Sequence, residues 1–330
     1  MLEKPKVVSL FSGCGGSSLG YELAGFEVIF AVECDKNAQL VYATNHPKTY
    51  LFSDDIKKLS IDFIFSKINL NPGELDLLDG SPPCQGFSTA GKRQFTDERN
   101  DLFLEYARIL EALKPKTFIM ENVPGMIKGI MKLKFKQILE KLISCGYVVK
   151  VAVLNAANYG VPQNRERLIF VGIRNDIGKT FKFPQPFSRQ ITVKQALADC
   201  PDYCDKPIIK EWQQRALNLL SCHSSTKEKQ VVFRQTKGTT GSAISMIILD
   251  PNKPCPTITK SEIAASGLIH PNKKRYLNLS ELKRLSSFPD DYWFLNRESG
   301  IERIGNAVPP LLIKAIAEQI KKDIYGQKAK

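Results

Sequence analysis

The sequence lacks any apolar run long enough to span a membrane. No stretch of its 330 residues approaches the roughly 20 apolar residues that a spanning helix needs, and glycines at 13, 15 and 16 come before a signal-peptide core could form. We therefore expect a cytoplasmic protein with no membrane partner. The chain also has no internal repeat, and its 43% hydrophobic and 25% charged residues predict one large and one smaller globular domain.

The sequence also lacks a closely spaced cysteine pair. Its eight cysteines are scattered, and free thiols are the usual state inside a cell. The densest group is Cys200, Cys204 and Cys222, beside His223, but this spacing fits no common zinc finger or ribbon. We therefore predict no metal site, and we expect any important cysteine to act chemically.

Negative charge is scarce in the second part of the chain. The formal net charge is +13, and residues 176–330 hold 25 of the Lys and Arg residues against 15 Asp and Glu. A basic surface attracts phosphates and speeds encounter with nucleic acid. Plain solubility is the alternative explanation of the same charge.

The first part of the chain alternates short apolar runs with amphipathic segments. Strands are predicted at 6–11, 27–33, 75–80, 117–122, 148–155 and 167–173, and helices at 17–26, 35–45, 101–115 and 134–147. This alternation is typical of an α/β fold with a doubly wound, mostly parallel sheet of Rossmann-like type. Ligands of such a sheet bind outside the carboxyl ends of its strands.

The regular pattern fades after about Ile173. The stretch from Asn175 to Pro271 is rich in Lys, Pro, Ser and Thr, with short strand-like runs such as QVVFRQ at 230–235 and AISMIIL at 243–249. Near the end, helices are predicted at 277–288, with Ser280 as its N-cap, and at 311–325. We expect a second, irregular domain here.

A glycine-rich loop follows the first predicted strand. In Phe11-Ser12-Gly13-Cys14-Gly15-Gly16, glycine lets the backbone approach a ligand, and the next helix presents free N–H groups. A dinucleotide enzyme, a methyltransferase and a simple tight turn all remain open at this point. Glu33 ends the second strand, where a carboxylate can accept ribose hydroxyls, and Asp55 could accept from an adenine amino group. Together they favour a cofactor that contains adenosine.

The segment Gly80-Ser81-Pro82-Pro83-Cys84-Gln85-Gly86-Phe87-Ser88 directly follows a predicted strand. Two prolines stiffen the chain, so the thiol of Cys84 is expected at the ligand edge of the sheet, which suits a nucleophile. A lone buried cysteine would be inert. The position after Pro-Pro favours the chemical role over the inert one.

Two further motifs belong to the same predicted edge. Glu121, in Glu121-Asn122-Val123, can donate a proton or a hydrogen bond to a bound base, or it can simply cap the next helix. In Gln163-Asn164-Arg165-Glu166-Arg167 the two arginines point to one side of an extended chain and could stabilise negative charge. A solvated basic face is the alternative for the arginines.

Taken in order, FSGCGG, GSPPCQGFS, ENV, QNRER and the terminal GNAVPP resemble the motifs of the DNA cytosine-5 methyltransferases, particularly the bacterial restriction-modification type. The resemblance implies a catalytic domain at 1–183 and 301–330 and a target-recognition domain at 184–300. It implies that Cys84 is the nucleophile, that Glu121 contacts N3 of the target cytosine, and that Arg165 and Arg167 lie at the active site.

The resemblance also implies S-adenosylmethionine as the cofactor and double-stranded DNA as the partner. The implied cofactor contacts are Phe11, Ser12, Gly13, Gly15, Gly16, Glu33, Cys34, Asp55, Ile56, Pro83, Leu102, Asn306 and Val308. Asp54 is the alternative to Asp55, because Ser53-Asp54-Asp55 replaces the more common Gly-Asp. Candidate DNA contacts are Lys92, Arg93, Arg234, Gln235, Lys237 and Thr239.

The implied reaction begins when the enzyme extrudes the cytosine from the duplex. Cys84 then attacks carbon 6 so that carbon 5 can accept the methyl group. We expect a monomer that acts as the modification enzyme beside a separate restriction endonuclease. A tRNA cytosine-5 methyltransferase is the rival, but the chain lacks the Cys-Phe-Thr signature of that branch. A non-catalytic DNA-binding homologue should have lost Cys84 or Glu121.

Overall fold

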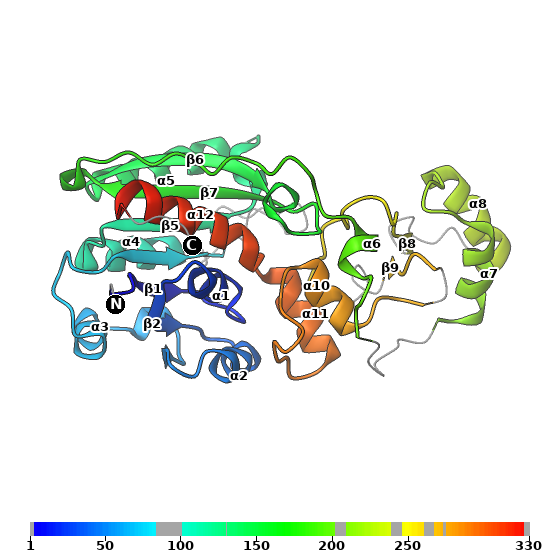
Figure 1. Cartoon of the computed structure of the whole chain (residues 1–330), viewed down its shortest axis with the longest axis horizontal. Helices are drawn as coiled ribbons and strands as arrows, with labels where there is room; N and C mark the ends of the chain where they lie inside the picture. The colour runs from blue at the N-terminus through cyan, green and yellow to red at the C-terminus, as the bar shows by residue number, and fades with distance from the viewer. Residues whose placement is uncertain are drawn as a thin grey trace. The chain divides into compact units, whose positions relative to one another are not determined.

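The computed structural model describes residues 3–83, 101–129, 131–201, 209–238, 246–260, 267–272 and 275–326. The chain divides into two compact units (Figure 1). The first consists of Met1–Asn155, Glu166–Pro186 and Val308–Lys330, and the second of Ala156–Arg165 and Phe187–Ala307. Within the described residues, no helix is long and apolar enough to cross a membrane.

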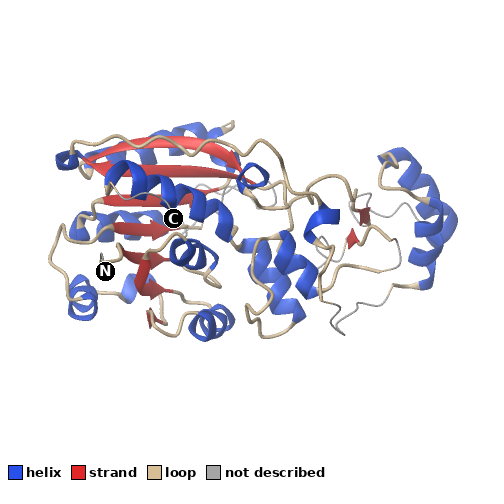
Figure 2. Cartoon of the chain, viewed as in Figure 1, coloured by secondary structure: helices blue, strands red, loops and turns tan. Residues whose placement is uncertain are grey.

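The first unit is built on a seven-stranded sheet with the order β3-β2-β1-β4-β5-β7-β6 (Figure 2). All neighbouring strands pair in parallel except β7, which is antiparallel to both β5 and β6. The strands are β1 (Lys6–Leu10), β2 (Glu27–Val32), β3 (Tyr50–Phe52), β4 (Leu77–Gly80), β5 (Thr117–Asn122), β6 (Tyr147–Asn155) and β7 (Glu166–Arg174). The predicted doubly wound, mostly parallel α/β sheet is confirmed.

The central strands are buried on both faces, as parallel strands covered by helices must be. Every residue of β4 and β5 is buried. One core cluster joins Leu78 and Phe118 of these strands to Ile64, Ile109 and Ile138 of the covering helices. The helices of this unit are α1 (Gly16–Leu23), α2 (Lys36–Asn45), α3 (Ile61–Ile68), α4 (Asp101–Leu113), α5 (Met131–Ser144) and α12 (Pro310–Ile324).

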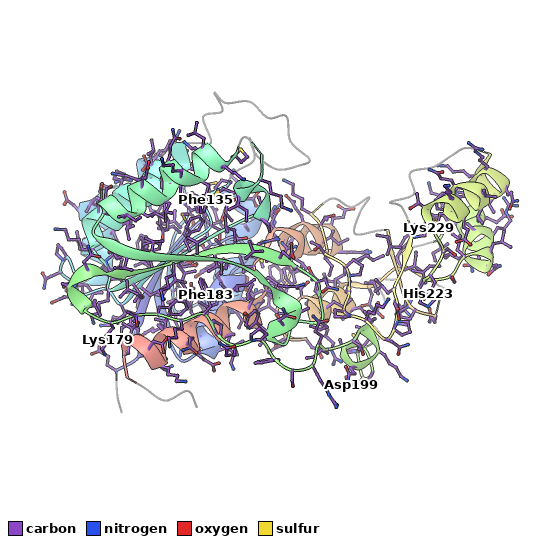
Figure 3. All side chains as sticks on the ribbon, turned by 90° about the horizontal axis from the view of Figure 1, so that it is seen from above. Phe135, Lys179, Phe183, Asp199, His223 and Lys229 are labelled. Atoms are coloured by element: carbon purple, nitrogen blue, oxygen red, sulfur yellow. The ribbon has the colours of Figure 1, made fainter. Side chains whose placement is uncertain are left out.

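Helices α5 and α12 cover opposite faces of the sheet (Figures 1 and 3). Phe135 of α5 packs on Phe170 of β7 with ring centroids 5.7 Å apart. On the other face, α12 packs against α1, where a Cβ on Gly20 would lie 2.6 Å from the carbonyl oxygen of Pro310. Only glycine allows this approach, so the last helix of the chain is part of the first unit.

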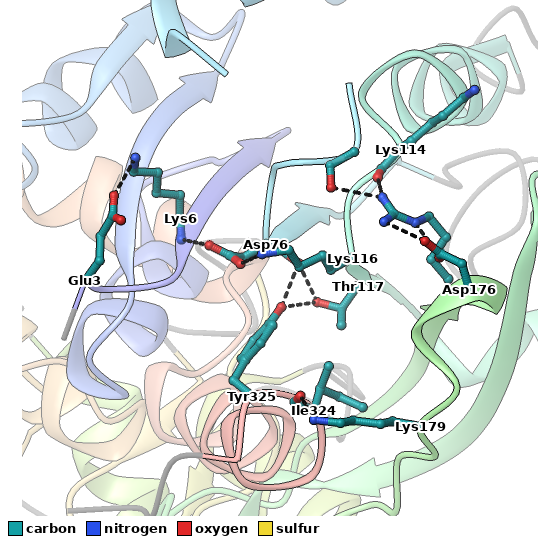
Figure 4. A network of polar contacts seen from close by, with 12 residues as sticks. Glu3, Lys6, Asp76, Lys114, Lys116, Thr117, Asp176, Lys179, Ile324 and Tyr325 are labelled. Carbon is teal, nitrogen blue, oxygen red and sulfur yellow. Dashed lines mark hydrogen bonds and ion pairs between the residues drawn. The ribbon is translucent and has the colours of Figure 1, made fainter. Parts of the chain in front are cut away.

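The end of α12 is also tied to the amino-terminal side of the central strands (Figure 4). The Tyr325 hydroxyl donates to the carbonyl oxygen of Asp76 at 2.8 Å, and Lys179 Nζ donates to the carbonyl oxygen of Ile324 at 2.7 Å. The Asp76 carboxylate accepts the Lys6 backbone N–H and the Lys116 ammonium group, both at 2.8 Å. These bonds join segments from both ends of the chain.

The second unit is mainly helical. Its elements are α6 (Val193–Ala196), α7 (Glu211–Leu219), α8 (Thr226–Lys237), β8 (Ile247–Ile248), β9 (Leu268–Ile269), α10 (Leu279–Leu285) and α11 (Arg297–Asn306). Helices α7 and α8 share with β8 and β9 a small core that includes Leu217, Phe233, Ile248 and Ile269.

Two local predictions in this unit are wrong. The strand-like run 230–235 lies inside α8, because Ser225 accepts from the Glu228 N–H and Glu228 accepts in return, forming a capping box that starts a helix. The N-cap of α10 is Asn278, which accepts from the Glu281 N–H at 2.8 Å, whereas Ser280 is buried inside the helix. In both cases the capping residue decides where the helix begins. It prevails over the β-branched residues of the first segment and over the Ser280 hydroxyl of the second.

A buried carboxyl group lies between β1 and β4. Asp79 is 2% exposed and pairs in register with Ser9, whose hydroxyl donates to it at 2.8 Å. The Tyr21 hydroxyl of α1 donates to its other oxygen at 2.9 Å. Burial raises the pKa of Asp79 to about 7, although the two hydroxyl bonds act in the opposite direction.

Asp79→Asn tests this burial. An Asp pKa in an unfolded chain is about 3.9, so the folded protein binds this proton more tightly, and the associated stability is lost as pH rises from about 4 to about 7. The amide has no charge to desolvate, so the variant should gain stability relative to the parent across that window, by up to about 4 kcal/mol. Thermal unfolding of both proteins at several pH values measures the difference. The prediction would be contradicted if the stabilities of the two proteins changed with pH in the same way.

Candidate functional site

Several of the predicted site residues lie at one edge of the sheet in the first unit. The loop after β1, Glu33 after β2, Asp55 after β3 and Glu121 at the end of β5 all follow the carboxyl ends of parallel strands. The order of the strands reverses between β1 and β4, so these two strands form the switch point of the sheet. Ligands of doubly wound sheets bind at such a point.

The loop after β1 has an unusual backbone. Phe11, Gly13 and Gly15 have φ values of 57°, 56° and 90°. The N–H and hydroxyl of Ser12 both donate to the carbonyl oxygen of Val32, at 3.0 and 2.9 Å, and Gly16 begins α1. A Cβ built on Gly13 would meet no atom within 4 Å, so the space beside this glycine is open.

Glu33 is held against this loop. One carboxylate oxygen accepts from the Gly13 N–H at 2.7 Å and the other from the Asp35 N–H at 2.8 Å. These two backbone donors fix the direction of the carboxylate. Its neighbour Cys34 is exposed, yet the pKa of its thiol is raised, first by partial burial and then by the Glu33 charge.

The two candidate aspartates after β3 have different partners. Asp55 accepts from the Lys57 N–H at 2.9 Å and begins a short 3-10 helix (Ile56–Lys58), whose first residue is buried. Asp54 lies 2.9 Å from the Lys58 ammonium group, which lowers the pKa of Asp54. Among the remaining cofactor candidates, Leu102 is half-buried in the main core, Asn306 is exposed in the second unit and Val308 is buried in the first.

The chain before Cys84 is bound to the end of β5. Asn122 Nδ2 donates to the carbonyl oxygen of Pro82 at 3.3 Å, and Asn122 Oδ1 accepts from the Val123 N–H at 2.9 Å. Cys84 itself lies outside the described residues, as do Lys92, Arg93 and Thr239.

An ion pair occupies the same edge. Arg167 Nε lies 2.7 Å from Glu121 Oε1, and the two side chains are only 12% and 11% exposed. They meet because β7 runs antiparallel to β5 and places Leu168 opposite Asn122. Burial lowers the pKa of Arg167 while the Glu121 charge raises it. A guanidinium group keeps its charge in proteins, so the buried cation of Arg167 has its carboxylate partner beside it.

Arg165 belongs to the second unit and has a different environment. It is 1% exposed, and its two terminal nitrogens donate to the carbonyl oxygens of Ile258 and Gly305, at 2.8 and 2.7 Å. Gln163 donates to the Ser286 hydroxyl at 2.9 Å and accepts from the Ile258 N–H at 3.2 Å. Gln163 and Arg165 therefore bind and position backbone groups of the second unit.

Three exposed candidates lie on one helix of the second unit. Arg234, Gln235 and Lys237 are in α8, and the Lys237 ammonium group lies 4.9 Å above the ring of Trp212. The contact with the ring holds the Lys237 side chain at the end of α8.

The sequence predictions missed Asp79 and Asn122 as site-supporting residues. Asp79 lies one residue before the Gly80 that opens the proline-rich segment, and Asn122 holds that segment by the Pro82 carbonyl. The available signal for Asp79 was an acidic residue within a buried apolar strand, which requires compensating partners.

Glu121→Gln tests the ion pair. The substitution leaves the Arg167 charge buried without its carboxylate, and removing one partner of a buried pair costs about 3–5 kcal/mol. We expect a loss near the lower end of this range, because both side chains keep some exposure. Urea denaturation measures the free energy of unfolding.

Glu111→Gln is the matched control. Its carboxylate lies 2.6 Å from the Lys141 ammonium group, but the two side chains are 47% and 37% exposed. Exposed pairs contribute about 0–1 kcal/mol, so this variant should lose much less stability. Equal losses of unfolding free energy in the two variants would show that the Glu121 pair stabilises the protein no more than an exposed pair does.

Comparisons with known proteins agree with this arrangement. The family model described as C-5 cytosine-specific DNA methylase matches residues 5–322. The type II methyltransferase M.DdeI of Desulfomicrobium norvegicum is 32% identical, over 95% of this chain and 88% of its own length. The type II methyltransferase M1.HphI of Haemophilus parahaemolyticus is 36% identical, over 96% of this chain and 86% of its own length.

Solved structures show the same fold. A prophage-encoded E. coli protein provisionally assigned as a DNA modification methyltransferase superimposes with a TM-score of 0.79 at 26% identity, over 98% of this chain and all of its own. DNMT2 of Spodoptera frugiperda gives a TM-score of 0.70 at 21% identity, over 96% of this chain and 99% of its own. The match over nearly the whole chain, on a sheet whose carboxyl edge holds the paired Glu121 and Arg167, shows that the protein belongs to the C-5 cytosine-specific DNA methylase family.

Proposed function

We propose that this DNA methyltransferase uses S-adenosylmethionine to methylate carbon 5 of a cytosine that it extrudes from double-stranded DNA. The observation that carries the proposal is the geometry at the end of β5. Glu121 is paired with Arg167, and the adjacent Asn122 holds the carbonyl oxygen of Pro82, two residues before Cys84. Cys84 and Glu121 are the two groups that the chemistry requires.

The loop after β1 fits an adenosine-containing cofactor. The space beside Gly13 is open, and the Glu33 carboxylate, fixed by two backbone N–H groups, keeps lone pairs free for ribose hydroxyls. The Asp55 carboxylate accepts from the Lys57 backbone N–H, whereas the Asp54 carboxylate is paired with the Lys58 ammonium group, so Asp55 is the better acceptor for an adenine amino group. When bound, S-adenosylmethionine supplies an electrophilic methyl group.

The remaining cofactor contacts are proposed from the motifs. Phe11, Ser12, Gly15 and Gly16 shape the loop, and the other proposed contacts are Cys34, Ile56, Pro83, Leu102, Asn306 and Val308. The raised pKa of Cys34 keeps its thiol protonated at neutral pH, so we assign it contact and not nucleophilic attack.

The thiolate of Cys84 makes the cytosine ring nucleophilic. Carbon 5 alone is too weak a nucleophile, so the sulfur forms a bond to carbon 6, and the displaced electron pair becomes available at carbon 5. Glu121 stabilises this species by transferring a proton to N3 and then accepting a hydrogen bond from the resulting N3–H. After carbon 5 has gained the methyl group it loses its proton, and the returning electron pair breaks the bond between Cys84 and carbon 6.

The two arginines have separate proposed roles. Arg167 keeps Glu121 oriented and balances its charge at a site that is largely shielded from water. Arg165, with donors on the carbonyl oxygens of Ile258 and Gly305, is a positioning residue that fixes the chain beside the terminal GNAVPP motif. Arg167 adds positive charge that favours a thiolate.

We propose that residues 184–300 recognise the DNA target and that 1–183 with 301–330 carry the reaction. The basic excess after residue 175 and the exposed Arg234, Gln235 and Lys237 of α8 support this division. Lys92, Arg93 and Thr239 remain proposed DNA contacts. The type II relatives support a role as the modification enzyme of a restriction-modification system. We propose in addition that the protein acts as a monomer, beside a separate endonuclease.

The test is methyl transfer from labelled S-adenosylmethionine to double-stranded DNA and, in parallel, to tRNA. The parent protein should label DNA and leave tRNA unlabelled, and Cys84→Ser should abolish the labelling because serine cannot supply a comparable nucleophile. Cys145→Ser is the matched control, since this free cysteine lies at the end of α5. DNA labelling by Cys84→Ser would refute the mechanism, and labelling of tRNA alone would refute the substrate.

A further inference from the structure

Three metal-binding side chains converge in the second unit. The sulfur of Cys222, a ring nitrogen of His223 and a carboxylate oxygen of Asp250 all lie within 4.8 Å of one another. Cys222 and His223 occupy the turn between α7 and α8, and Asp250 follows β8. Figure 3 shows His223 on the part of the chain that carries these elements.

The backbone around each of the three is fixed by its own hydrogen bonds. The Ser221 N–H donates to the Ser224 hydroxyl at 2.9 Å, and the His223 N–H donates to the Ser221 hydroxyl at 3.3 Å. The Asp250 carboxylate accepts from the Asn252 N–H at 2.9 Å. The turn and the strand end are therefore structured before any ligand binds.

The donor set identifies the class of metal. A thiolate disfavours magnesium and calcium, whereas sulfur, imidazole nitrogen and carboxylate oxygen together suit zinc. Ligand atoms around a tetrahedral zinc lie about 3.3–3.6 Å apart, given bonds of about 2.0–2.3 Å. The separations are at most 4.8 Å and need to close by only about 1 Å, which small side-chain rotations can supply.

The site is open enough for an ion to enter. His223 is exposed, and Cys222 and Asp250 are half-buried. Lys253 Nζ is the competing cation, 3.5 Å from the Asp250 carboxylate, but its side chain is 70% exposed and can turn away at little cost. Three protein ligands leave a fourth position for water.

A metal here would reinforce a weak part of the fold. The core that joins α7 and α8 to the two-residue strands β8 and β9 consists of Ala216, Leu217, Leu220, Val232, Phe233, Met246, Ile248, Ile269 and Tyr276. Cys222 packs at the edge of this cluster. Small cores of this kind are commonly stabilised by a bound metal.

We propose that Cys222, His223 and Asp250 bind one Zn²⁺ ion, which crosslinks the turn between α7 and α8 to the end of β8. The ion displaces the proton of the Cys222 thiol and the Lys253 ammonium group from Asp250. The site is separate from methyl transfer, because none of the three residues belongs to the proposed cofactor or catalytic groups.

The experiment uses the full-length protein after treatment with a chelator. Zinc is added in competition with a chromogenic chelator, and cobalt is added to a second sample. The parent should bind one equivalent of zinc, unfold at a higher temperature with zinc than without, and show a thiolate-to-cobalt charge-transfer band. Cys222→Ser should abolish that band, and His223→Asn and Asp250→Asn should each weaken zinc binding at least 10-fold.

Cys145→Ser is the matched control, because it removes a free cysteine of the first unit. It should keep the cobalt band and the parent's zinc affinity. Absence of stoichiometric zinc binding by the parent would overturn the proposal, and so would a cobalt band that persists in Cys222→Ser. Circular dichroism of each variant without metal shows whether it is folded, so that lost binding can be assigned to the ligand.

Discussion

The antiparallel pairing of β7 with β5 is the constraint on which the candidate active site depends. It places Arg167 against Glu121, 2.7 Å apart, at the edge where the parallel strands end. A fully parallel sheet would place the start of β7 at the opposite edge, and the carboxylate would then be buried without a cation. An unpaired buried charge is strongly unfavourable, so Glu121 can be buried here only because β7 runs in the direction that brings Arg167 beside it.

The polar groups at this edge are each satisfied by a neighbouring strand or loop. Glu33 holds the Gly13 N–H, Asn122 holds the Pro82 carbonyl, and Asp79 accepts the Ser9 and Tyr21 hydroxyls. The loop after β1 and residues 81–83 after β4 are therefore held by a framework of hydrogen bonds that are buried or partly buried. Such a framework fixes the direction of functional side chains more narrowly than exposed loops alone can.

The sequence allowed the sheet and its helices to be predicted, because apolar periodicity and the proline and glycine positions are local signals. The sequence did not show which side chains become partners, because such partners are far apart along the chain. The pairing of Arg167 with Glu121 and the burial of Arg165 within the second unit depend on which strands lie side by side. QVVFRQ at 230–235 was assigned to a strand from its composition, although the Ser225 cap makes it helical. Asp250 joins Cys222 and His223 only through the fold, which explains why cysteine spacing indicated no metal site.

The proposed mechanism depends on the attack of Cys84 on the target cytosine, and covalent trapping on DNA tests this step. The measurement uses duplex DNA in which 5-fluorocytosine replaces the target base, together with S-adenosylmethionine. Fluorine cannot leave carbon 5 as a proton does, so a denaturation-resistant adduct should accumulate, and peptide mapping should place the DNA on Cys84. An adduct on any other residue, or efficient labelling of ordinary DNA with no trapped adduct on the fluorinated duplex, would contradict the account.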